Sequence, residues 1–156
     1  MNKYAYRLFS PMKEIKGSVE INAPLERVWQ AITDFKSYPE WNPWITRMDG
    51  DPKVGSKVGV TVKAPGRKDT NFTSEVLEIN PNHEMLMRGT VIKGMLSDDH
   101  LFKLEPIGDS STRFFQSVSF KGAMSSMIGG MVRDQQKGLD LMNEAMRKRC
   151  EGMGKS

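Results

Sequence analysis

The chain has 156 residues, 38% of them hydrophobic and 27% charged, with a formal net charge of +4. This length suits one domain with its own core, and the composition excludes a disordered protein. No apolar run approaches the roughly 18 residues that span a bilayer, and residues 1–12 lack the continuous apolar stretch of a secretion signal.

The single cysteine, Cys150, excludes an internal disulfide and a cysteine-cluster metal site. We therefore expect a cytoplasmic protein without integral membrane association. One domain should cover residues 14–151, with an N-terminal extension at 1–13 and a C-terminal tail at 152–156. The only basic run, 147–149, falls near a helix end, where cations favour the helix dipole. Since no aromatic platform accompanies it, we expect no nucleic-acid binding.

The first strand and helices are predicted from the spacing of apolar residues and from Asn and Pro positions. Residues 14–22 alternate apolar and polar side chains, which predicts a strand. Asn22 is the expected cap of a helix over 24–33, with Pro24 just inside its first turn. A short helix or turn is expected over 35–38, limited by Pro39 and Pro43.

Five further strand patterns follow in series, separated by turn sequences rich in Gly, Pro and Asn. The short connections predict an antiparallel meander. These strands are expected over residues 54–63, 70–79, 84–91, 98–105 and 112–121.

From residue 123 to 150 the apolar period changes from two to 3.6, which predicts one long helix. Gly129 and Gly130 lie inside it and are expected to allow close approach to the sheet. One stripe of the helix carries Met124, Met127, Ile128, Met131, Gln135, Gly138, Met142, Ala145 and Arg149.

Several segments of this sequence are similar to a known group. They include Ile21–Trp29 (INAPLERVW), Phe35–Trp44 (FKSYPEWNPW), Gly50–Gly55 (GDPKVG) and Asp99–Pro106 (DHLFKLEP). Together with the order of elements, they resemble the START-related helix-grip superfamily, which includes polyketide cyclase/dehydrase-like and lipid-transfer-like domains. The resemblance covers roughly residues 14–151. It implies an α+β fold in which a curved seven-stranded antiparallel sheet wraps a long C-terminal helix, with a cavity between them.

The strands after residue 98 supply candidate polar groups for that cavity. If Phe102 and Leu104 face inward, so does His100, and Gln116 shares a face with Phe114 and Val118. Pairing Leu104 with Thr112 places His100 opposite Gln116, with Gln135 as a possible third member. Such groups orient ligands in apolar pockets, although they can equally satisfy one another or water.

Methionines are frequent, and several are expected on both cavity walls, where their flexible side chains fit varied ligands. A methionine-filled core is the alternative interpretation. Trp44 could lie on the cavity rim or anchor its loop, whereas Trp41 is expected to be an anchor. The candidate ligand-binding residues are His100, Gln116, Phe102, Phe114, Val118, Met85, Met87, Met127, Met131, Gln135, Met142 and Trp44.

Catalytic signals are few. His83 lies in a polar turn, and Asp98 and Asp99 are expected to face solvent at a strand start. Many relatives carry an acid where this chain has Val118, which argues against acid–base chemistry there. No metal-binding, nucleophile or phosphate-loop motif is present, so we expect no metal and no cofactor.

We therefore expect a protein that binds or transports a small hydrophobic ligand (a lipid, an isoprenoid or a polycyclic, polyketide-like compound) and is not an enzyme. Two alternatives stay open. One is a polyketide cyclase or dehydratase with His100 as general base and Gln116 orienting a carbonyl. The other is a co-chaperone-type interaction domain, which would carry an exposed apolar patch instead of a closed cavity.

Overall fold

The computed structural model describes residues 13–152, so the predicted extension before Lys13 and the tail after Gly152 lie outside the described residues. The first half of the chain forms β1 (Lys13–Ile21), α1 (Leu25–Thr33), the 3-10 helix η2 (Phe35–Ser37), α2 (Tyr38–Trp41), β2 (Ile45–Asp49), β3 (Lys57–Val62) and β4 (Thr70–Asn80). The second half forms β5 (Glu84–Ile92), β6 (Leu96–Pro106), β7 (Thr112–Lys121), the 3-10 helix η3 (Ala123–Met127) and α3 (Gly129–Gly152).

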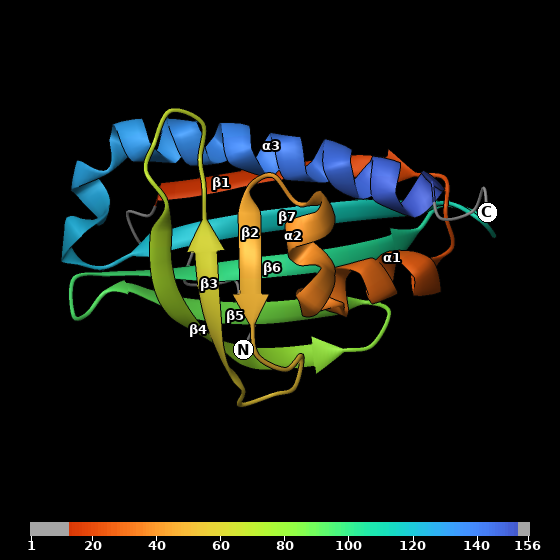
Figure 1. Ribbon diagram of the computed structural model, residues 1–156, viewed down its shortest axis with the longest axis horizontal. Helices are drawn as coiled ribbons and strands as arrows, with labels where there is room; N and C mark the ends of the chain where they lie inside the picture. Colours follow the sequence, from red (N-terminus) through yellow and green to blue (C-terminus); the bar gives the residue numbers. More distant parts are fainter. Residues whose placement is uncertain (1–12, 153–156) are drawn as a thin grey trace.

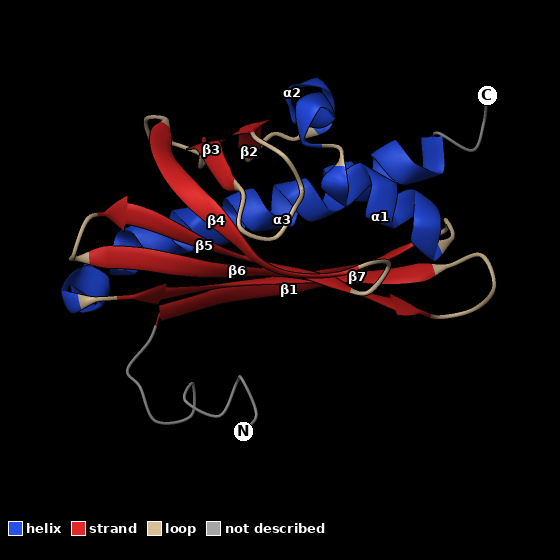
Figure 2. Cartoon of the chain, turned by 90° about the horizontal axis from the view of Figure 1, so that it is seen from below, coloured by secondary structure: helices blue, strands red, loops and turns tan. Residues whose placement is uncertain are grey.

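Seven strands form one antiparallel sheet in the order β1-β7-β6-β5-β4-β3-β2. Helices α1, α2 and α3 lie on the same side of this sheet, and β3 and β2 curl over toward them (Figures 1 and 2). Helix α3 packs mainly against β1 and runs along the sheet. The predicted helix-grip architecture is confirmed. In residues 13–152, no helix is long and apolar enough to cross a membrane.

The residue pattern did not predict β2; only the family resemblance implied a seventh strand. This strand has five residues, and its pairing with β3 shifts register between Ile45 and Arg47. The irregularity places Ile45 and Met48 inside, three positions apart. A strict period of two is therefore absent, which explains why the pattern was missed.

The expected ends of the early helices need correction. Pro24, not Asn22, is the N-cap of α1; its backbone is extended, and its carbonyl accepts the Arg27 and Val28 N–H groups. Pro39 does not stop the short helix but lies in the first turn of α2, where its missing N–H costs nothing.

The predicted single C-terminal helix is two elements, because the backbone departs from helical geometry at Ile128 between η3 and α3. Gly129 and Gly130 therefore stand at the start of α3. No neighbouring atom lies within 4 Å of the place where a Gly129 Cβ would sit, so this glycine makes no close approach. The close approach occurs at Gly138, where a Cβ would lie 2.2 Å from Trp44 Cδ1.

Gly138→Ala should therefore lower the free energy of unfolding by about 1–3 kcal/mol, although alanine favours helices over glycine by about 1 kcal/mol. Trp44 is buried and hydrogen-bonded, so it cannot move aside freely. Urea unfolding of both variants checks this, with Gly129→Ala as the matched control that should be neutral or stabilising. Equal free energies of unfolding for the two variants would show that the close contact between Gly138 and Trp44 does not limit the size of residue 138.

Candidate functional site

A partly open cavity lies between the concave face of the sheet, the start of α3 and the overhanging strands β2 and β3. Most of its wall is apolar. The wall is formed by Trp44, Ile45, Met48, Val60, Val62, Thr70, Phe72, Ser74, Met87, Val91, Asp98, His100, Phe102, Val118, Phe120, Met131 and Gln135.

The cavity volume is about 60 Å³, counted as the space open to the centres of water molecules. One water needs roughly 10–15 Å³ in that measure, so a few waters or a small organic group fit without movement. A larger guest requires side chains to shift. Met48, Met87 and Met131 border the cavity and, with three rotatable bonds each, can move at low cost.

The predicted pairing of β6 with β7 is wrong by two residues. Thr112 lies opposite Pro106, which places Phe102 opposite Gln116 and His100 opposite Val118. The strands extend further toward the turn than expected, so the loop is shorter. His100 and Gln116 are nevertheless diagonal neighbours, with 2.8 Å between His100 Nε2 and Gln116 Oε1.

A buried polar chain links β6, β7 and α3. Gln116 Nε2 donates to Asn143 Oδ1 at 2.8 Å, which leaves Gln116 Oε1 to accept the Nε2–H of His100. Gln116 is completely buried and does not border the cavity. Its amide is therefore occupied by protein partners. The predicted stripe of α3 correctly included the buried Gln135, Gly138 and Met142. Sequence reasoning missed Asn143 because the buried face continues through Leu139, Asn143 and Met146 and not through Ala145 and Arg149.

Gln135 is not the third member of this chain. Its Oε1 accepts a hydrogen bond from Trp44 Nε1 at 2.7 Å, and both residues border the cavity. Trp44 packs against Gly138 and also borders the cavity. It is therefore both an anchor and part of the wall, the two interpretations that the sequence left open. Trp41 packs edge-on against Tyr38, as an anchor does.

His100 is held by aromatic neighbours as well as by Gln116. Its ring stacks on Phe102 with centroids 4.0 Å apart, and Trp44 lies 5.7 Å away. Burial lowers the pKa of His100 to about 4, which outweighs the opposing effect of the Gln116 hydrogen bond. The imidazole is therefore neutral at physiological pH and carries its proton on Nε2.

The ring signals of His100 should stay unchanged between pH 8 and pH 5.5 in NMR spectra, because protonation occurs only near pH 4. The ¹⁵N shifts should identify the Nε2–H tautomer. His83, exposed in the β4–β5 turn, provides the second histidine signal for comparison. A His100 midpoint above pH 6, or the Nδ1–H tautomer, would contradict the hydrogen-bond chain.

The predicted solvent exposure of Asp98 and Asp99 is wrong, because both residues are buried. Strand β6 begins two residues earlier than expected, at Leu96, and alternation with His100 turns Asp98 inward. Asp98 borders the cavity. Asp99 points the other way, where Arg88 Nε donates to it at 2.8 Å and Lys121 also pairs with it. Burial alone would raise the pKa of Asp99, but these two cations hold it below its usual value.

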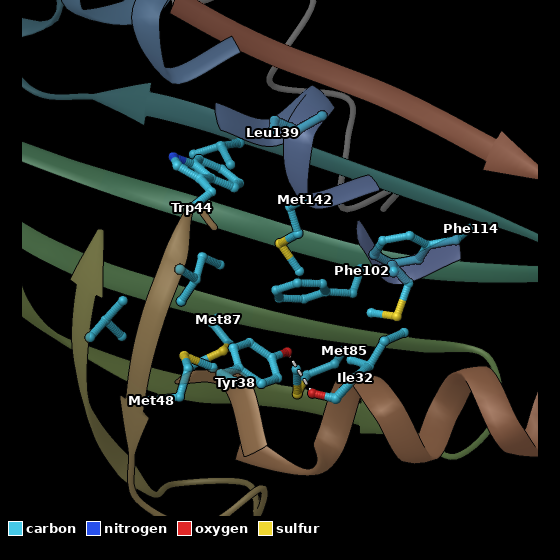
Figure 3. Packing of buried hydrophobic residues seen from close by; sticks show 14 of the residues in the cluster. Ile32, Tyr38, Trp44, Met48, Met85, Met87, Phe102, Phe114, Leu139 and Met142 are labelled. Carbon is cyan, nitrogen blue, oxygen red and sulfur yellow. Dashed lines mark hydrogen bonds between the residues drawn. The ribbon is translucent and has the colours of Figure 1, made fainter. Parts of the chain in front are cut away.

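Seven of the predicted ligand-binding residues border the cavity: Trp44, Met87, His100, Phe102, Val118, Met131 and Gln135. Four others are buried outside it, and Figure 3 shows Met85, Phe114 and Met142 packed in the core, where Gln116 is also buried. The expected inward position of Met127 is wrong, since this side chain is 76% exposed. Met127 belongs to η3, and the break at Ile128 removes it from the stripe that α3 buries.

Residues 12–147 match the family model described as polyketide cyclase / dehydrase and lipid transport. The chain belongs to this family. No curated protein matches it.

Several solved structures resemble this member of the polyketide cyclase/dehydrase and lipid transport family. The ZhuI aromatase/cyclase from Streptomyces sp. R1128 is 15% identical, with a TM-score of 0.75 over 90% of this chain and 94% of its own. A START superfamily protein from Mycobacterium smegmatis is 19% identical, with a TM-score of 0.71 over 90% and 98%. Norcoclaurine synthase from Thalictrum flavum, a point mutant in complex with a transition-state analogue, is 17% identical, with a TM-score of 0.71 over 93% and 97%. At these identities the similarity shows the fold alone.

Proposed function

We propose that this protein binds or transports a small hydrophobic ligand (a lipid, an isoprenoid or a polycyclic, polyketide-like compound) in the cavity beneath β2 and β3. The observation that carries the proposal is a partly open, mainly apolar cavity bordered by residues of the hydrophobic core. Its wall has a few polar groups, the arrangement by which small-molecule pockets orient their ligands. Membership of a family described in part by lipid transport supports this interpretation.

The enzyme alternative has less support. It assigned the orientation of a carbonyl to Gln116, whose amide is bound by His100 and Asn143 and does not border the cavity. It also assigned general-base catalysis to His100, whose pKa lies near 4, far below the value that suits a base at neutral pH. These observations favour a carrier over a cyclase or dehydratase.

The co-chaperone alternative predicted an exposed apolar patch in place of a cavity. Among the large exposed apolar side chains of the described residues, Val54, Ile107 and Leu141 lie in separate parts of the chain. Of these described side chains, only Ile92 and Met95 share a turn, to which η3 with Met127 is hydrogen-bonded through Met124. A cavity bordered by six of the seven strands supports an internal guest instead.

The proposal is tested by filling the cavity. Val118→Phe places a larger side chain on the cavity wall, beside His100 on the neighbouring strand. Val54→Phe makes the same change at a surface site that is 63% exposed. Each protein is incubated with a lipid extract and examined by native mass spectrometry. The parent protein and the Val54 variant should retain a small apolar ligand, and the Val118 variant should not.

Near-UV circular dichroism of the Val118 variant shows whether its tertiary structure is preserved. Retention of nothing by the parent protein, or equal retention by a folded Val118 variant, would refute the proposed function.

A further inference from the structure

The cavity wall contains one carboxyl group, Asp98, on β6 two residues before His100. No lysine or arginine of the described residues borders the cavity. The neighbouring carboxyl, Asp99, has two cationic partners on the opposite face of the sheet. Within residues 13–152, strand β6 therefore carries Asp99, which pairs with two cations, on the outer face of the sheet, and Asp98, which has no cation partner, on the inner face.

The Asp98 side chain is held in a defined position by β5. Its Oδ1 accepts a hydrogen bond from the Gly89 N–H at 3.0 Å. The approach requires a glycine, because a Cβ at residue 89 would lie 2.2 Å from that oxygen and 2.7 Å from Phe72 Cε2. The backbone N–H of Asp98 itself also interacts with this carboxyl. Both donors are backbone groups, and since a carboxylate accepts about four hydrogen bonds, the fixed carboxyl can still accept one from a ligand.

The other polar groups of the wall add no positive charge. His100 is neutral near pH 7, and Gln135, Thr70 and Ser74 carry no charge. A ligand carboxylate would therefore enter an apolar space beside an acid, without a cation to compensate for lost hydration. A hydroxyl or an ammonium group would instead donate a hydrogen bond to the Asp98 carboxyl.

We propose that Asp98 anchors the polar end of the ligand, and that the cavity selects apolar molecules with a hydrogen-bond donor, a hydroxyl or amine, over those with a carboxylate. This inference rests on the proposed function and narrows its ligand class by excluding fatty-acid anions. Burial raises the pKa of Asp98 to about 7, and repulsion from Asp99 acts in the same direction. The hydrogen bond from the Gly89 N–H lowers this pKa but does not offset the effect of burial. A carboxyl in a cavity whose pKa is shifted by burial and a neighbouring charge is a frequent property of binding sites.

Four naphthalene derivatives of similar size test the preference: 2-naphthol, 2-(aminomethyl)naphthalene, 2-naphthoate and 2-methylnaphthalene. Their affinities for the wild-type protein are measured by titration calorimetry at pH 7.5. The naphthol and the amine should bind at least about tenfold more tightly than the naphthoate, since a hydrogen bond to a charged group contributes about that factor. The methyl compound should bind with intermediate affinity.

Asp98→Asn retains an oxygen for the Gly89 N–H but replaces the other carboxyl oxygen with a donor. In this variant the amine should lose about tenfold or more in affinity and the naphthoate should gain, while the methyl compound is unaffected. Asp109→Asn makes the same change in an exposed turn outside the cavity wall and should alter none of the four affinities.

The ligand series on the wild-type protein decides the question even if the Asp98 variant does not fold. Naphthoate binding as tight as that of the amine and the naphthol would overturn the inference. Unchanged affinity for the amine in a folded Asp98 variant would also overturn it. In both cases, binding of the methyl compound would still support the proposed function. Failure of all four compounds to bind would overturn both.

Discussion

Asp98→Asn is expected to raise the free energy of unfolding by about 2–4 kcal/mol at pH 8 and by less than about 1 kcal/mol at pH 4. The pKa of Asp98 is about 7 in the folded state, against an ordinary aspartate pKa of 3.8. Between these values the folded protein holds a proton that the unfolded chain has released, so stability falls as the pH rises. Each pKa unit corresponds to about 1.4 kcal/mol, so a shift of about three units gives an upper limit of roughly 4 kcal/mol.

Asparagine avoids this loss because it is neutral at every pH and its oxygen can still accept the Gly89 N–H. His100 also titrates in this window, with the opposite sign, but it is present in both proteins and cancels in the difference. Urea unfolding at the two pH values measures the effect, with Asp109→Asn as the control. A pH-independent difference, or a destabilised variant at pH 8, would mean that Asp98 is not a buried charge.

Gln116→Met is expected to lower the free energy of unfolding by about 2–5 kcal/mol. Methionine fills a similar volume but leaves the Nε2–H of His100 and the Oδ1 of Asn143 without their partners. An orphaned buried polar group costs about 1–3 kcal/mol, and this change creates two. Urea unfolding at pH 7.5 measures the loss.

A double-mutant cycle separates this effect from simple misfit of the new side chain. Adding Asn143→Leu to the Gln116 variant removes one of the orphaned groups, so the second change should cost clearly less in the variant than in the parent protein. Strict additivity of the two substitutions would show that Gln116 and Asn143 do not depend on one another.

The strand series and the long helix could be predicted from the sequence, because period-two patterns such as Val58, Val60 and Val62 depend only on which face is buried. The family resemblance supplied the sheet curvature and the seventh strand. Alternation along β6 correctly turned His100 and Phe102 toward the cavity. Met87 and Met131 were likewise placed on its wall.

The remaining errors share a physical cause: alternation gives the face of a strand but not where the strand begins or which residue it pairs with. The start of β6 at Leu96 places Asp98 inside, and two extra paired residues move Gln116 from the position directly opposite His100 to a diagonal one. Asn143 lies beside the predicted stripe of α3, and the packing of α3 on β1 turns this residue inward. The close approach at Gly138 depends on Trp44, which is far from it in the sequence. Extending the alternation from His100 back by two residues would have identified Asp98.

Methionine methyl NMR tests the central claim, that the cavity beneath β2 and β3 holds a ligand, most directly. Protein labelled at the methionine methyl groups is titrated with 2-naphthol. The signals of Met48, Met87 and Met131, which border the cavity, should shift together and saturate, while those of exposed Met95 and Met127 stay in place. Shifts confined to the exposed methionines, or no shift at any methionine, would contradict the assignment of this cavity as the binding site.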